Sequence, residues 1–119
     1  MNVGERIAVV CDEAMPREEQ RDAVLARLRD TGHAVIRLSY AQLYAFAGNM
    51  LELRNSDGER VLAMSQQAYD SLDEQQRATL AANSRIISVA INNIESSAGG
   101  SVRCMLAEIH LPIEGNEDL

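Results

Sequence analysis

The chain has 119 residues and a formal net charge of −7, and it contains 46% hydrophobic residues but no tryptophan. This length fits one globular unit with an aliphatic core, and the acidic balance argues against nucleic acid or an anionic membrane surface as a partner. No apolar run approaches the ~20 residues that span a membrane, and residues 1–10 lack the pattern of a secretory signal. We therefore expect a cytoplasmic protein.

In the first half of the chain, strand patterns alternate with helix patterns. Runs of β-branched and apolar residues predict strands at residues 6–11, 34–38 and 49–53. Pro16 opens a helix with apolar positions at helical spacing, and Gly32 ends it. Ser39 can cap a short helix that runs through residue 43, and the NSDG sequence at 55–58 is typical of a hairpin turn.

The same order of elements then starts again. The predicted elements are a strand at residues 60–64, a helix capped by Ser65, a helical stretch at 73–82, a strand at 86–89, a short turn or helix at 92–95, and a closing strand at 104–111. Asn49 and Cys104 start equivalent strands of the two series, about 55 positions apart. Residues 1–112 therefore divide into two repeats, about 5–58 and 59–111, and an acidic tail follows at 113–119.

A repeat of this size cannot bury its faces alone, so two copies leave open ends. We expect the chain to form a homo-oligomer or to associate with other subunits through these ends. The two copies differ just before the cysteine: Leu43 precedes Asn49 by six residues, but Ile94 precedes Cys104 by ten. Loops are where function is added to a repeated scaffold, and the added residues lie in the segment that contains two glycines.

Cys104 is the candidate catalytic residue. Cys11 and Cys104 are expected to be free thiols, and no spacing of cysteine and histidine suits a metal site. Gly99 and Gly100 let the backbone approach a ligand closely, and successive N–H groups can stabilise developing negative charge. The sequence thus predicts that Cys104 is a nucleophile. The alternative is a buried cysteine in a strand after a tight turn.

A nucleophilic cysteine normally needs a base, and neither histidine is well placed to be one. On the predicted closing strand His110 would lie about 20 Å from Cys104, and His33 is expected to be an exposed loop residue. Asn49 could hydrogen-bond a polar substrate or merely cap a turn. Glu95, just before the glycines, is expected to be solvated, with contact to a ligand as the alternative.

Other side chains are expected to have structural roles only. Asp12 and Glu108 are predicted to be solvated surface groups. Met50, Met64 and Met105 are predicted to fill the core.

Several segments carry a resemblance to a known family. The sequences AGNMLEL at 47–53, MSQ at 64–66, AYDSL at 68–72 and GGSVRCM at 99–105 resemble the C-terminal part of the arginine deiminase-related proteins, including the citrulline utilization hydrolases. These belong to the pentein superfamily, together with arginine deiminases, dimethylarginine dimethylaminohydrolases and glycine amidinotransferases. The likeness covers residues 4–112, and the segment around Cys104 is its most specific part.

The resemblance implies an α/β fold that is part of a five-bladed pentein propeller, about two of five ββαβ-type blades. It also implies a reaction in which a cysteine thiolate attacks the central carbon of a guanidino or ureido group. Ammonia or an amine then leaves, and water or an acceptor amine releases the adduct. Cys104 matches the nucleophile, and the candidate substrate-binding residues are Asn49, Gly99, Gly100 and Ser101. No cofactor and no metal are expected.

The chain also departs from the family pattern. The catalytic histidine of the family, in a His-Thr-Asn type motif, and its acidic guanidinium-binding residues lie upstream of the segment that residues 1–4 resemble. Arginine deiminases often have an arginine five residues before the cysteine, where this chain has Gly99. The first hypothesis is therefore the C-terminal portion of a hydrolase of arginine-type or citrulline-type substrates, incomplete alone.

Two other hypotheses stay open. One is a non-catalytic module that self-associates or binds a fuller homologue. The other is a thiol-based sensor centred on Cys104.

Overall fold

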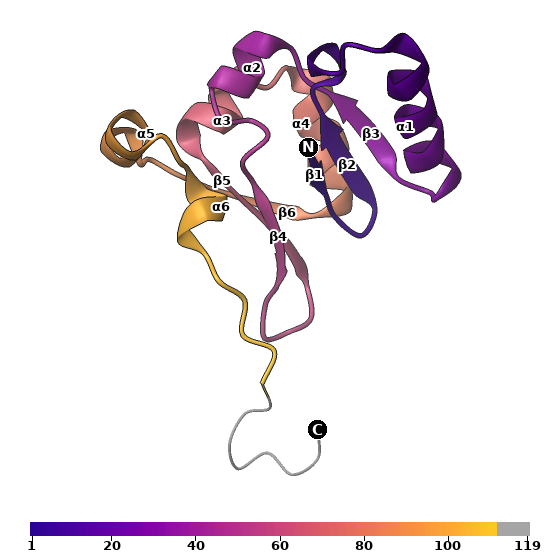
Figure 1. Ribbon diagram of the computed structural model, residues 1–119. Helices are drawn as coiled ribbons and strands as arrows, with labels where there is room; N and C mark the ends of the chain where they lie inside the picture. Colours follow the sequence, from indigo (N-terminus) through magenta and orange to yellow (C-terminus); the bar gives the residue numbers. More distant parts are fainter. Residues whose placement is uncertain (112–119) are drawn as a thin grey trace.

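A computed structural model describes residues 1–111, which form two three-stranded sheets with helices around them (Figure 1). The strands are β1 (Asn2–Val3), β2 (Ile7–Val10), β3 (Ala34–Arg37), β4 (Leu51–Arg54), β5 (Arg60–Ser65) and β6 (Arg85–Val89). The helices are the 3₁₀ turn η1 (Asp12–Ala14), α1 (Glu18–Asp30), α2 (Tyr40–Tyr44), α3 (Gln66–Ser71), α4 (Glu74–Asn83), α5 (Asn92–Ala98) and α6 (Val102–Met105). The predicted mixed α/β class is confirmed.

Both sheets have the same topology. In the first sheet β1 pairs antiparallel with β2, and β2 pairs parallel with β3; in the second, β4, β5 and β6 are paired in the same way. Strand β4 lies inside the predicted first repeat, about 5–58, yet it belongs to the second sheet. The division near residue 58 and the number of propeller blades therefore stay predictions, although two such sheets are compatible with part of a pentein-like fold.

The helix starts follow from short polar side chains that satisfy free backbone N–H groups. The Ser39 hydroxyl accepts a hydrogen bond from the backbone N–H of Gln42, and the Asp73 carboxylate does the same for Gln76; in both cases the glutamine reaches back to the capping residue. Ser65 caps α3 through the N–H of Ala68. These helices begin where the sequence predicts.

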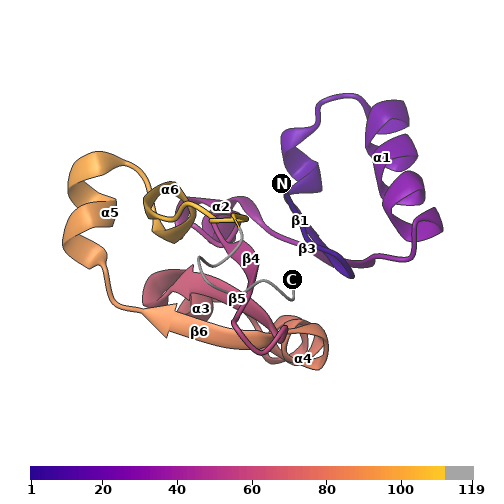
Figure 2. The ribbon, with the colours of Figure 1, turned by 90° about the horizontal axis from the view of Figure 1, so that it is seen from below.

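One hydrophobic core extends across both sheets. All four residues of β2 are buried, and Met50, Leu62, Met64 and Leu80 from the second half of the chain have no exposed surface. Helix α4 contacts β6 of the second sheet and β3 of the first, so it joins the two sheets. Helices α1 and α5 lie at opposite ends of the molecule (Figures 1 and 2).

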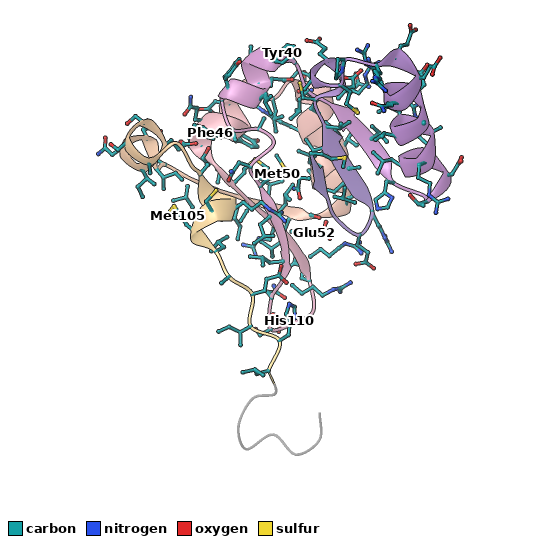
Figure 3. All side chains as sticks on the ribbon, viewed as in Figure 1. Tyr40, Phe46, Met50, Glu52, Met105 and His110 are labelled. Carbon is teal, nitrogen blue, oxygen red and sulfur yellow. The ribbon has the colours of Figure 1, made fainter. Side chains whose placement is uncertain are left out.

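The predicted closing strand at residues 104–111 is wrong. Cys104 lies in the short helix α6, and residues 106–110 have no regular secondary structure. The apolar residues of this segment are exposed, and no strand within residues 1–111 takes up their backbone hydrogen bonds, which a strand requires. Met105 is correspondingly 53% exposed rather than buried in the core (Figure 3).

Strand β1 (Asn2–Val3) has no counterpart among the strands that the sequence predicts. The acidic tail at 113–119 lies outside the described residues. Among residues 1–111, every helix is too short or too polar to cross a lipid bilayer.

Candidate active site around Cys104

Cys104 is an exposed free thiol near the start of α6. The two glycines before Cys104 have different structural roles. Gly99 ends α5 in the left-handed conformation, with φ of 67°, and a side chain there would meet open space. Gly100 lies against the cysteine: a Cβ on it would be 3.3 Å from both the Cβ and the Sγ of Cys104. The alternative of a buried strand cysteine is therefore wrong.

Asn49 reaches Cys104 from the other half of the chain. Its side-chain Nδ2 donates a hydrogen bond to Sγ of Cys104 over 3.2 Å. Asn49 lies just before β4, and its own N–H is bound by the carbonyl of Phe46 at 2.9 Å. Phe46 has a φ of 64°, which is unusual for a bulky residue and turns the chain tightly ahead of Asn49. The structure thus brings Asn49, Gly100 and Cys104 into contact.

Arg103 ties α6 to the sheets. Its guanidinium Nη1 lies 3.1 Å from the Asn2 side-chain oxygen in β1 and 3.1 Å from the backbone oxygen of Met50, beside β4. Through these two contacts, Arg103 links the start of α6 to both halves of the protein.

The surroundings favour the thiolate form of Cys104. The hydrogen bond from Asn49 lowers the pKa of the Cys104 thiol below its ordinary value, and a backbone hydrogen bond at Ser101 and the positive charge of Arg103 act in the same direction. Since the thiolate is the nucleophilic form of cysteine, this environment suits a reactive residue. The charge of Arg103 contributes, but Asn49 has the larger effect.

Ser101 and Glu95 form a buried pair beneath the site. The hydroxyl of Ser101, which is fully buried, donates to Oε2 of Glu95 over 2.9 Å. Glu95 is only 4% exposed, and its Oε1 has no hydrogen-bond partner among the described residues. The expectation that Glu95 is solvated is therefore wrong, because α5 turns it inward beneath the glycine loop. A lone glutamate before two glycines gives no sequence signal for burial.

Neither histidine of the described chain contacts Cys104. The two ring nitrogens of His33 lie 2.8 Å from Thr31 Oγ1 and 3.0 Å from the Gly4 carbonyl oxygen. His110 lies 3.0 Å from Glu108, on the segment that leaves α6 and well away from Phe46 and Met50 (Figure 3). His33 is half-buried rather than an exposed loop residue.

Asp12 is buried and paired with Arg37, which corrects its predicted place on the surface. In residues 1–111 no group of three or more histidine, cysteine or carboxylate side chains is arranged to hold a metal ion.

Over residues 1–111 the chain matches the family described as N,N dimethylarginine dimethylhydrolase, eukaryotic. No curated protein and no solved structure matches the chain significantly. The family match supports an arginine-modifying hydrolase of the pentein superfamily, and it does not single out the arginine deiminase or citrulline branch that the sequence resemblance named. The chain belongs to the eukaryotic N,N dimethylarginine dimethylhydrolase family.

Proposed function

We propose that the chain provides the nucleophile of a hydrolase that breaks a C–N bond in a methylated arginine or a related guanidino or ureido compound. The observation that carries the proposal is the exposed Cys104 thiol, held by Asn49 in a setting that favours its thiolate, in a chain of this family. Arginine and citrulline, the substrates expected from the sequence, remain candidates beside dimethylarginine.

The proposed reaction has two steps. The Cys104 thiolate forms an S–C bond to the central carbon of the guanidino group, and the bond from that carbon to the terminal nitrogen, which carries the methyl groups in dimethylarginine, breaks. The departing amine takes up a proton. Water then attacks the same carbon and gives up a proton, and the S–C bond breaks to return the thiolate and release the ureido product. Gly99 and Gly100 leave the backbone open to the substrate on this side of Cys104.

The reaction also needs a proton carrier, and the described residues place none beside the sulfur. Both nitrogens of His33 already have partners, and His110 is paired with Glu108. The chain alone is therefore expected to turn over slowly, well below the rate of about 1–1000 per second that is common for enzymes. A soluble base such as imidazole should partly replace the missing group.

The test measures release of dimethylamine from dimethylarginine, and of ammonia from arginine and citrulline, with and without added imidazole. We expect imidazole to raise the rate for at least one substrate in the wild-type chain and not in Cys104→Ala. Cys11→Ala is the matched control, because Cys11 is buried in the core and should leave the rate unchanged. Equal rates in the wild type and Cys104→Ala would contradict the proposal.

The alternative function is a module that associates with a second copy of the chain. It is favoured by β6, which is an edge strand of the second sheet and exposes 42% of Ile87 and 50% of Val89. Ile87→Lys should then shift the sedimentation coefficient to that of a monomer, while Arg85→Lys on the same strand should not. A wild-type chain that sediments as a monomer at high concentration would exclude this alternative.

A further inference from the structure

The start of α6 lacks the cap that its own sequence provides. Ser101 occupies the N-cap position, where a serine hydroxyl would ordinarily accept a hydrogen bond from a free N–H of the first turn. Its hydroxyl instead donates to the buried Glu95, and Ser101 makes no side-chain cap. The backbone N–H of Arg103 therefore needs another acceptor.

Asn49 supplies that acceptor from the first half of the chain. Its Oδ1 accepts the N–H of Arg103 over 3.0 Å, 54 residues away in the sequence. A backbone N–H can only donate, so this bond fixes which end of the Asn49 amide is oxygen. The Nδ2 end must then face the Cys104 sulfur, where it donates over 3.2 Å. The Asn49 side chain thus caps α6 and also contacts the thiol of Cys104, the residue after Arg103.

We propose that Asn49 is a positioning residue for Cys104, whose amide holds the first turn of α6 with its oxygen and presents a donor to the sulfur with its nitrogen. This inference rests on the proposed function, because it assigns Asn49 to the nucleophile rather than to the substrate. The tight turn at Phe46, which has a φ of 64°, keeps Asn49 in place. Gly100 lies against the thiol on another side, because a Cβ added to it would come within a tight 3.3 Å of Sγ.

The variant Asn49→Asp separates the contact that the amide oxygen makes with the helix from the contact that the amide nitrogen makes with the sulfur. Asn49→Asp has nearly the same shape and retains an oxygen for the N–H of Arg103. It replaces the donor that faces Cys104 with a negatively charged oxygen, which disfavours the thiolate.

The experiment measures iodoacetamide alkylation of the two cysteine-containing peptides as a function of pH, by mass spectrometry on the whole chain. The variants are compared by the pH at the midpoint of the profile rather than by the alkylation rate, because the reactivity of a thiolate itself changes with the pKa of its thiol. For Asn49→Asp we expect the Cys104 midpoint to rise by about one pH unit, which lowers the thiolate fraction roughly ten-fold below the midpoint. Asn93→Asp introduces the same charge on the exposed surface of α5 and should leave the midpoint unchanged.

Cys11 reports folding in the same samples. It is buried in the core, so its alkylation stays slow while the chain is folded. If Asn49→Asp exposes Cys11, the comparison moves to Asn49→Ser, which is too short to donate to the sulfur and should also raise the midpoint. An unchanged Cys104 midpoint in the folded variant overturns the proposal.

The result is independent of the turnover test. An unchanged midpoint removes the positioning role of Asn49 even when hydrolysis depends on Cys104. Equal turnover in the wild type and Cys104→Ala removes the proposed function and leaves the measured link between Asn49 and the thiol intact.

Discussion

Asn49 and Cys104 are 55 residues apart in the sequence and joined by a hydrogen bond of 3.2 Å. The sequence predicts that both residues start strands of a repeat; in the structure Asn49 precedes β4, Cys104 lies in the helix α6, and their side chains are in contact. Their pairing connects the two halves of the chain at the one exposed cysteine among the described residues.

The Ser101 to Glu95 hydrogen bond should stabilise the loop beneath Cys104. Ser101→Ala removes the only hydrogen-bond partner that the described residues give the Glu95 carboxyl group, and a buried polar group without a partner costs about 1–3 kcal/mol. Urea unfolding should show a loss of that size. Ser97→Ala, on the exposed surface of α5, is the control and should cost much less. Equal losses in the two variants would show that the buried pair contributes nothing.

The two glycines should respond differently to alanine. Gly99→Ala forces a side chain into the left-handed conformation and should cost about 1 kcal/mol of unfolding free energy, with little steric effect on the sulfur. Gly100→Ala should instead slow alkylation of Cys104 several-fold, because its Cβ would crowd Sγ at 3.3 Å. Unfolding and alkylation are measured on both variants. If both variants lost the same unfolding free energy and slowed alkylation equally, the two glycines would not have these separate roles.

Asp12 should give the protein a stability that disappears in acid. The hydrogen bond from Arg37 lowers the pKa of the buried Asp12 carboxyl group below its usual value. A folded-state pKa below the unfolded one stabilises the protein above the unfolded pKa, near pH 4, and this contribution is lost as the pH falls through the folded pKa. Asp12→Asn should therefore cost about 1–3 kcal/mol near neutral pH and progressively less in acid.

Urea unfolding across this pH range checks the prediction for Asp12. Asp22→Asn, on the exposed side of α1, is the control and should follow the wild-type curve. A cost for Asp12→Asn that is the same at every pH would show that loss of packing, rather than loss of the charged pair, explains it.

Much of the scaffold could be predicted from the sequence because its signals are local. Ser39 and Asp73 each begin a helix with a glutamine three residues later, and a side chain that caps a helix needs no distant partner. The apolar run of β2 likewise predicts a buried strand on its own. Cys104 and Asn49 could be named as candidates because they hold matching positions in the predicted repeat, and their side chains are hydrogen-bonded in the fold.

The remaining features depend on partners that sequence patterns do not reveal. The sequence after Cys104 predicts a strand, but none of the strands in residues 1–111 pairs with this segment, and it is exposed. Glu95 looks like a surface residue until α5 places it beneath Ser101. Asp12 looks solvated until Arg37, on the neighbouring parallel strand, reaches it.

The most direct test of the central claim is to trap the covalent intermediate. The chain is mixed with dimethylarginine and imidazole, quenched in acid, digested, and its cysteine-containing peptides are weighed by mass spectrometry. We expect the Cys104 peptide to gain the mass of the substrate less dimethylamine, the Cys11 peptide to be unmodified, and Cys104→Ala to carry no adduct. Release of dimethylamine at the same rate from Cys104→Ala would contradict it.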